Sequence, residues 1–321
     1  MPLPSQLQNL SLPVICSPMF IASGLDLVIA QCKAGVVGSF PALNARPKEE
    51  LDRWIDRIES ELAAYKAANP AAIVAPYAIN QIIHKSNDRV EHDIEVCVRR
   101  KVPIIISSLR APNEVIPAVH SYGGIVLHDV INVRHAAKAL EAGVDGLILV
   151  CAGAGGHGGA LSPFALLGEV RRIFAGPLVL AGSITTGQAV LAAQAAGADL
   201  AYIGTRWLAT REANISEPYR QAVLESTAAD VIYTDLFSGV HGNYLKKSIV
   251  NAGFDPAKLP TSDPSKMNFG TGGGADKKVW RDIWTAGQGV GQIDDAPAAA
   301  EVVARLKAEY SAARKRICGA A

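Results

Sequence analysis

The sequence predicts an α/β fold, a (β/α)8 TIM barrel whose carboxyl-terminal part forms a helical and loop cap over the barrel mouth. Between residues 14 and 205, eight short aliphatic segments alternate with helical or loop segments, a pattern typical of a parallel sheet with crossover helices. Three helix-to-strand joins use the same short Ala-Gly turn, at residues 34–36, 142–145 and 196–199, and a closed barrel repeats such turns. No GxGxxG fingerprint follows the first strand, which weakens the alternative of an open dinucleotide-binding sheet.

Length, composition and charge narrow the class of protein. The 321 residues are 49% hydrophobic and 19% charged, which is enough apolar sequence for a large core and excludes a disordered chain. A net charge of +1 gives no field that would attract nucleic acid or an anionic membrane. We therefore expect neither as a partner.

Cysteine usage and the amino-terminal residues bear on the compartment. Five cysteines without a CxxC pair favour a reducing compartment and argue against a disulfide framework or a zinc site, and no metal is predicted. The first residues lack the basic and apolar regions of a signal peptide, and no apolar run approaches ~18 residues. We expect a cytoplasmic protein without a membrane span.

The barrel elements follow one another in order along the chain. The predicted strands are residues 14–16, 36–38, 71–75, 103–106, 124–127, 147–150, 178–180 and 200–203. The predicted helices are residues 25–33, 47–68, 89–100, 113–121, 133–141, 162–174 and 187–196. Gly35 suits the end of the first helix, and the proline and acids at 47–50 suit the first turn of the second.

The pattern changes after residue 210. A helix is predicted at 218–227, a glycine- and polar-rich segment follows at 261–275, and an amphipathic helix covers 297–315, with apolar residues on one face. The predicted parts are a cofactor-binding barrel at 1–210, a cap at 211–296 and a carboxyl-terminal helix at 297–321 that packs back on the barrel.

The stretch at 145–160, DGLILVCAGAGGHGGA, carries the main candidate for catalysis. It passes from an apolar strand into a loop of glycine and alanine, where glycine lets the backbone approach a ligand closely. The one side chain there that can do proton chemistry is His157, and an imidazole acts as acid or base near neutral pH. The alternative is a flexible loop with an incidental histidine.

Ligands of a barrel bind at the carboxyl ends of its strands. In this chain those ends are small, polar or glycine residues, although strand ends often are so without binding anything. The candidate cofactor contacts from the first six strands are Pro18, Met19, Asn80, Ser107, His128, Ala154, Gly155 and Gly156.

The turns after the last two strands, AGSITTG and IGTR, have the composition of a phosphate site. The usual phosphate site of a barrel lies there and uses backbone N–H groups and a helix N-terminus. The candidates are Gly182, Ser183, Gly204 and Thr205, with Thr185 or Thr186 as helix cap. The same residues could form only a tight turn and a cap. A phosphorylated cofactor such as FMN fits this arrangement.

Several motifs in series resemble the nitronate monooxygenase (2-nitropropane dioxygenase) family of FMN-dependent (β/α)8 barrels. These motifs are the AGGHxG loop at 154–159, the PxxxxPM start at 13–19, the phosphate turns at 181–183 and 204–206, the WLAT segment at 207–210, and the cap segments TDLFSGVHGNYL at 234–245 and IWTAGQGVG at 283–291. The resemblance covers nearly the whole chain.

The resemblance implies a flavoprotein oxidoreductase that converts alkyl nitronates, or neutral nitroalkanes, and dioxygen into a carbonyl compound and nitrite. It implies that FMN is held by the strand-end residues named above and that His157 lies beside the flavin ring. There His157 would take the α-proton of a neutral nitroalkane or bind an anionic nitronate. The prediction includes a homodimer.

Three cap residues, His241, Trp284 and Gln288, are candidate substrate contacts, with a turn residue the alternative for His241 and cap core the alternative for Trp284. One position departs from the family. Related sequences often carry lysine where this chain has Asp129, and a carboxylate there would repel an anionic flavin edge. Either another cation compensates, with Lys85, Lys246 and Lys247 as candidates, or Asp129 points away.

Other activities use the same barrel and a similar histidine loop. Flavin-dependent NAD(P)H:quinone reductases and enoyl-acyl-carrier-protein reductases are the alternative enzymes, and both would need a nicotinamide to reduce the flavin. A non-catalytic or flavin-storing barrel is the alternative outside the enzymes.

Overall fold

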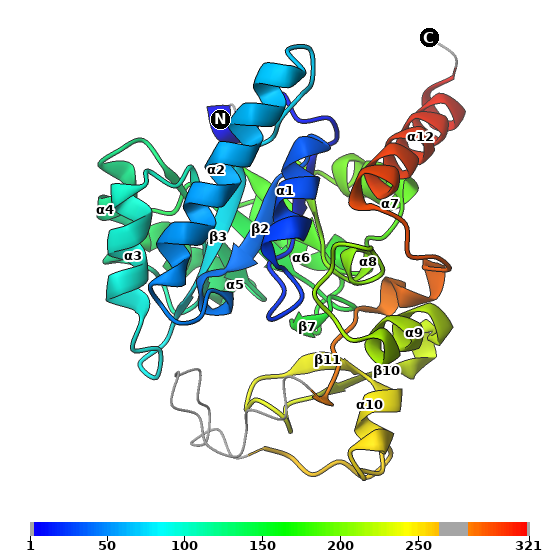
Figure 1. Ribbon diagram of the computed structural model, residues 1–321. Helices are drawn as coiled ribbons and strands as arrows, with labels where there is room; N and C mark the ends of the chain where they lie inside the picture. The colour runs from blue at the N-terminus through cyan, green and yellow to red at the C-terminus, as the bar shows by residue number, and fades with distance from the viewer. Residues whose placement is uncertain (1–2, 263–281, 320–321) are drawn as a thin grey trace.

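A parallel barrel of eight strands forms the centre of the computed structural model, which describes residues 3–262 and 282–319 (Figure 1). The strands are β1 (Val14–Cys16), β2 (Gly38–Pro41), β3 (Tyr77–Ile83), β4 (Ile104–Leu109), β5 (Ile125–Val130), β6 (Gly146–Val150), β8 (Leu178–Ala181) and β9 (Leu200–Ile203). Their order is β1-β9-β8-β6-β5-β4-β3-β2, and a parallel bridge between Ile15 and Val37 joins the two ends. The predicted (β/α)8 barrel is confirmed.

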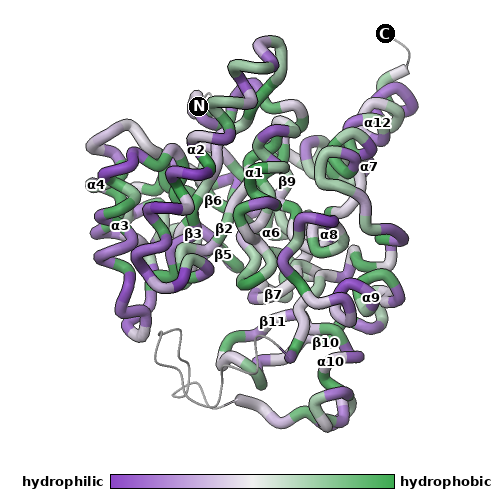
Figure 2. Tube along the Cα trace, in the orientation of Figure 1, coloured by the Kyte–Doolittle hydropathy of each residue, from purple (hydrophilic) through white to green (hydrophobic). Residues whose placement is uncertain are grey.

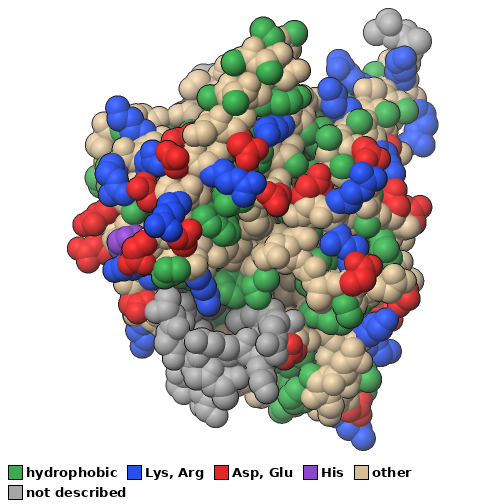
Figure 3. Space-filling model, viewed as in Figure 1, with side chains coloured by type: hydrophobic (Ala, Val, Ile, Leu, Met, Phe, Trp, Pro, Cys, Tyr) green, Lys and Arg blue, Asp and Glu red, His purple; other side chains and the backbone are tan. Residues whose placement is uncertain are grey.

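Helices surround the strands on the outside of the barrel. They are α1 (Leu25–Lys33), α2 (Glu50–Ala68), α3 (Val90–Arg99), α4 (Val115–His120), α5 (Val133–Ala142), α6 (Pro163–Arg171), α7 (Gly187–Ala195) and α8 (Thr205–Leu208). Hydrophilic turns recur along α2 and α3 (Figure 2), as expected for helices with one face toward water. On the face in Figure 3, acidic and basic side chains are intermixed.

Alternate residues of each strand point to opposite sides, and the buried core accordingly has two parts. One part fills the barrel interior and includes Ile104, Ile106, Leu127 and Ile148. The other lies between strands and helices and includes Ile105 of β4. This alternation decides which residues at the strand ends can reach a ligand.

Two strand boundaries differ from the prediction. The prediction of a strand at 71–75 is wrong, because β3 begins only at Tyr77, after Pro76. Proline lacks the N–H that a central strand needs, so pairing with β2 and β4 starts beyond it. The second strand lies later than predicted, at Gly38–Pro41, with Val37 contributing only a bridge.

The segment after β9 contains a small sheet, where helices and loops were expected. Its elements are α9 (Glu217–Glu225), β10 (Val231–Thr234), β11 (Gly242–Leu245), α10 (Lys246–Asn251) and the 3-10 helix η6 (Gln288–Gln292). Strand β11 pairs antiparallel with β10 on one side and with β7 (Gly156–His157) on the other. The histidine loop of the barrel is therefore joined to the cap, and residues 263–275 of the predicted polar segment lie outside the described residues.

Helix α12 (Ala299–Cys318) lies against α7 and α1. The contact with α7 is close, because a Cβ on Gly187 would lie 2.1 Å from the Leu306 carbonyl oxygen. Figure 1 places α12 and the amino-terminal segment at the end of the barrel away from the cap. Division of the chain at residues 210 and 296 stays a prediction. Over the described residues, no helix combines the length and apolarity needed to cross a bilayer.

Candidate active site

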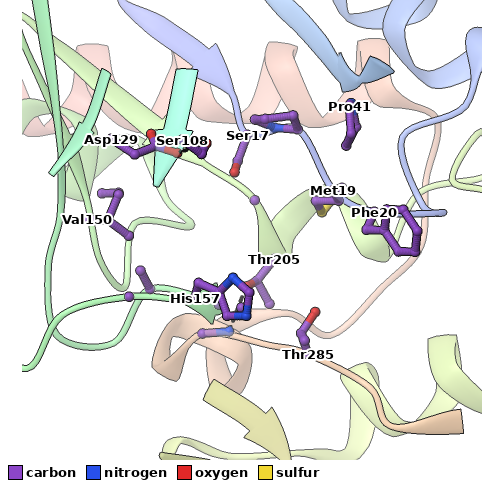
Figure 4. Close-up of a pocket in the computed structure, with 18 of the residues that line it drawn as sticks. Ser17, Met19, Phe20, Pro41, Ser108, Asp129, Val150, His157, Thr205 and Thr285 are labelled. Carbon is purple, nitrogen blue, oxygen red and sulfur yellow. Dashed lines mark hydrogen bonds between the residues drawn. The ribbon is translucent and has the colours of Figure 1, made fainter. Parts of the chain in front are cut away.

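A cavity of about 1150 Å³ lies between the carboxyl ends of the barrel strands and the cap (Figure 4). The barrel contributes strand ends such as Ser17 and Ser108, and the cap contributes Phe237 and Thr285. The volume lies slightly above the ~300–1000 Å³ typical of small-molecule sites. There is room for a cofactor and a small substrate together.

Most of the predicted site residues line this one cavity. They are Pro18, Met19, Asn80, Ala154, Gly155, Gly156, His157, Gly182, Ser183, Gly204 and Thr205. Strands far apart in the sequence thus bring the predicted phosphate turns and the histidine to the same space. The roles assigned to these residues stay predictions.

Two predicted cofactor contacts, Ser107 and His128, do not line the cavity. Both are buried, and Ser107 Oγ lies 2.8 Å from His128 Nδ1 on the outer side of the strands. Burial lowers the pKa of His128 to about 4. On both strands the prediction named a residue that points outward. The next residue along each strand, Ser108 or Asp129, points inward and lines the cavity.

The three predicted substrate contacts also lie outside the cavity lining. His241 is exposed and stacks on Tyr233, with ring centroids 5.1 Å apart. The ring of Trp284 stacks on that of Tyr219 within the cap, with centroids 5.3 Å apart. Trp284 is therefore part of the cap core, which was the alternative to a substrate contact. Gln288 is exposed, and its backbone N–H donates to the Gly153 carbonyl at 2.9 Å.

Residues beside Trp284 and Gln288, namely Ile283, Thr285, Gly287 and Gly289, line the cavity instead. The cap segment 283–291 therefore borders the site through different side chains from those expected. Among described lining residues, Arg46 is the one lysine or arginine, and its guanidinium carbon lies 5.3 Å from the Phe20 ring centroid. No motif in the sequence pointed to Arg46.

His157 lies on β7, the two-residue strand that pairs with β11. Its Nε2 is 2.7 Å from Ser238 Oγ, and Ser238 Oγ is 3.0 Å from the Val240 carbonyl oxygen. Ser238 Oγ has one proton, so it either gives this proton to the Val240 carbonyl and accepts from Nε2–H, or donates it to Nε2 in the other tautomer. Burial lowers the pKa of His157 to about 4, and the imidazole is therefore neutral at pH 7.

The backbone around His157 requires glycine at two positions. Gly156 has a φ of +69°, in the left-handed region, and a Cβ there would meet nothing within 4 Å. Across the ladder, a Cβ on Gly242 would lie 2.9 Å from the Gly156 carbonyl oxygen. The side chain of Asn243 holds the same loop by donating to the Ala154 carbonyl at 2.6 Å. The cap thus positions the histidine.

The turns after β8 and β9 are each held by contacts with other segments around the cavity. Gly182 has a φ of +133°, and a Cβ there would lie 2.7 Å from the Ala152 carbonyl oxygen. Thr186 caps α7 by accepting from the Ala189 N–H, as one of the two predicted alternatives had it. Thr205 Oγ1 accepts from Gly287 N–H at 2.8 Å, which ties the β9 turn to the cap.

Asp129 points toward the cavity and not away from it. Asn80 Nδ2 donates to Ser108 Oγ at 2.8 Å, and Ser108 Oγ donates to Asp129 Oδ2 at 2.6 Å. Burial raises the pKa of Asp129 to about 7, against a smaller lowering by Ser108. The three lysines considered as compensating cations, Lys85, Lys246 and Lys247, are not among the lining residues.

Comparison with known proteins identifies the relatives of this chain. The family model for nitronate monooxygenase matches residues 5–309. A nitronate monooxygenase of Paraburkholderia phytofirmans is 27% identical, with 92% of each chain covered. A carboxyl-CoA dehydrogenase acting on an octahydroindene, from Rhodococcus jostii, is 25% identical over 77% of this chain and 66% of its own length.

Solved structures show the same fold over nearly the whole chain. FabK of Thermotoga maritima has a TM-score of 0.79 and 21% identity, with 98% of this chain and 97% of that chain covered. A nitroalkane oxidase of Streptomyces ansochromogenes has a TM-score of 0.76 and 23% identity, with 98% and 100% covered. At such identities the likeness concerns the fold alone.

Proposed function

Because the chain belongs to the nitronate monooxygenase family, and is therefore a flavin-dependent oxidoreductase, we propose that it binds FMN and oxidises alkyl nitronates. Neutral nitroalkanes are the second substrate class in this proposal, and dioxygen is the oxidant. The observation that supports this proposal is that His157 and the two strand-end turns, at Gly182–Ser183 and Gly204–Thr205, line one cavity.

The chemistry of the cavity fits FMN in two respects. The turns at Gly182–Ser183 and Gly204–Thr205 offer backbone and hydroxyl groups of the kind that hold phosphate. Gly156 leaves open space where a side chain would project, so a flat ring can approach the loop. When bound, FMN would accept electrons from the substrate and pass them to dioxygen.

His157 would act on the substrate proton. In the tautomer whose Nε2–H donates to Ser238, Nδ1 would take the α-proton of a neutral nitroalkane, while Ser238 keeps the ring oriented through Nε2. An alkyl nitronate has already lost this proton. For that substrate, the other neutral tautomer, with Nδ1–H toward the cavity and Nε2 accepting from Ser238, would let His157 donate a hydrogen bond to a nitronate oxygen.

Steady-state turnover with and without a nicotinamide tests this proposal. We expect the FMN-loaded protein to consume dioxygen and release nitrite with an alkyl nitronate alone. We expect no rapid bleaching of the flavin by NADH or NADPH under anaerobic conditions. Rapid bleaching without nitronate turnover would instead identify a NAD(P)H-dependent quinone or enoyl reductase.

A further inference from the structure

The loop between β1 and α1 forms one wall of the cavity through Pro18, Met19, Phe20 and Ile21. Figure 4 shows Met19 and Phe20 on the side of the cavity away from Val150. Pro18 and Met19 are predicted cofactor contacts, so the conformation of this loop bears on cofactor binding.

The backbone of this loop makes a tight turn at Ile21. The Ala22 N–H donates to the Phe20 carbonyl at 2.8 Å, which closes a three-residue γ-turn with Ile21 at its centre. Ile21 has a φ of +66°, and a γ-turn with positive φ is the rare and strained form, whereas its mirror image with negative φ is common. A positive φ is especially unfavourable for a β-branched side chain. The loop therefore holds Ile21 in a conformation that the chain by itself disfavours.

The side chain of Asn44 holds this turn from the neighbouring strand. Asn44 is the last residue of the 3-10 helix η2 (Ala42–Asn44), which follows β2 directly. Its Oδ1 accepts from the Ile21 N–H at 2.9 Å, and its Nδ2 donates to the Met19 and Ser23 carbonyls at 3.1 and 3.0 Å. An N–H only donates and a carbonyl only accepts, so these three contacts fix the amide of Asn44 in one orientation.

These hydrogen bonds oppose a change of φ at Ile21. Rotation about that bond turns the chain before it relative to the chain after it, and Asn44 binds groups on both sides. Asn214 adds support, since its Nδ2 donates to the Ile21 carbonyl at 3.2 Å and its N–H donates to the Ala22 carbonyl at 3.0 Å. Both of these contacts lie after the rotating bond, so Asn44 is the side chain that joins the two halves of the turn.

We propose that Asn44 is a cofactor-positioning residue, which keeps the loop after β1 in the positive-φ turn so that the loop can contact FMN. This inference rests on the proposed function, because the cofactor is FMN. Without the three hydrogen bonds, Ile21 would populate the common mirror-image turn, and only the molecules with the original turn would bind FMN as the wild type does. The apparent dissociation constant is then the intrinsic one divided by the fraction of such molecules.

Titration of flavin-free variants with FMN tests the positioning role. We expect Asn44→Ala to weaken FMN binding about 5- to 150-fold, the population ratio that corresponds to the usual strain of such a residue. In an Ile21→Gly background the same substitution should weaken binding only about twofold, because glycine adopts positive and negative φ about equally. An Ile21→Ala background is the matched control. It shortens the side chain but keeps the penalty on positive φ, and it should retain most of the loss.

Amide hydrogen exchange in the flavin-free proteins tests the contact without the cofactor. The Ile21 amide should exchange faster in Asn44→Ala than in the wild type, because it loses its acceptor. Asn69→Ala is the control for loss of an asparagine side chain. Asn69 is exposed after the end of α2, outside the cavity lining, and its Nδ2 donates to the Tyr65 carbonyl at 3.0 Å. This variant should change neither the exchange at Ile21 nor the affinity for FMN.

Three results would overturn this inference. They are unchanged FMN affinity in Asn44→Ala, an equal loss of affinity with isoleucine and with glycine at position 21, and unchanged exchange of the Ile21 amide. Failure of the wild type itself to bind FMN would instead overturn the proposed function together with the cofactor role of the loop. In that case faster exchange at Ile21 in Asn44→Ala would still show that Asn44 holds the turn.

Discussion

The neutral state of the His157 ring follows from where the cap holds it. Ser238 contacts Nε2 without adding a charge, and burial keeps the pKa of His157 at about 4. A neutral imidazole can accept a proton, while the low pKa makes it a weak base. The residue is therefore suited to a substrate proton that is already acidic, as one next to a nitro group is.

We expect His157→Asn to retain bound FMN and to lower kcat/KM for a neutral nitroalkane about 10²- to 10⁴-fold, because a positioned base contributes about that much. Turnover of the corresponding nitronate should fall far less. The matched control is His241→Asn, which changes an exposed histidine outside the cavity lining. Equal losses for both substrates, or none in His157→Asn, would contradict the base role.

The pH profile of kcat/KM for a neutral nitroalkane should follow the same group. The active form is the neutral imidazole, which predominates above its pKa, so the rate should stay constant as pH falls toward 5. It should then decrease about tenfold per pH unit below a midpoint near 4. A midpoint near 6.5, as for an exposed histidine, would show that burial does not lower the pKa of His157.

Single residues at the strand ends were hard to predict because the side-chain period of a strand is two. A prediction that is wrong by one position selects a side chain that points to the helix layer and not to the cavity. This is why Ser107 and His128 were predicted in place of their neighbours Ser108 and Asp129. Predictions at glycine positions were less sensitive to such a shift, because a turn of several glycines lines the cavity with its backbone whichever residue points inward.

At the scale of elements, the pairing of β7 with β11 is the contact that places the histidine. Gly242 faces His157 in the ladder, and a Cβ on Gly242 would approach the Gly156 carbonyl oxygen to 2.9 Å. The backbone of one or the other strand would have to move to admit a side chain. Activity and stability should therefore both respond to this position.

We expect Gly242→Ala to lower the free energy of unfolding by ~1–3 kcal/mol, the usual cost of overpacking, and to reduce turnover by displacing His157. Gly168→Ala in α6 is the matched control. A Cβ there meets nothing within 4 Å, and alanine in a helix should stabilise by ~0.5–1 kcal/mol. Thermal or urea unfolding measures both, and unchanged stability and turnover in Gly242→Ala would contradict the role of this pairing.

The cap sheet had no clear local signature in the sequence. Strand β7 has two residues, too few for an alternating pattern, and its partner lies in a distant part of the chain. Strand β10 has the sequence VIYT, whose composition favours a β-strand. No strand was predicted there, because the cap was expected to contain only helices and loops. Barrel strands such as β6 and β9 were predictable because each is a short buried aliphatic run between helical segments.

At the scale of the whole molecule, the repeat of strand and helix predicted the barrel, and the barrel rule predicted the end at which a site would lie. The sequence could not predict the cavity itself, because its walls come from both the strand ends and the cap. Arg46 and Ser238, from different parts of the chain, line the same cavity only in the folded protein. Their place in the site depends on how the cap lies over the barrel.

The proposed function requires that the cavity hold FMN by its phosphate, with the ring beside His157. Equilibrium titration of flavin-free protein with FMN and with riboflavin, followed by flavin fluorescence, measures whether the phosphate contributes to binding. We predict saturable binding of one FMN per chain and markedly weaker binding of riboflavin, which lacks the phosphate. Equal affinity for the two flavins, or no binding of either, would rule out this mode of cofactor binding.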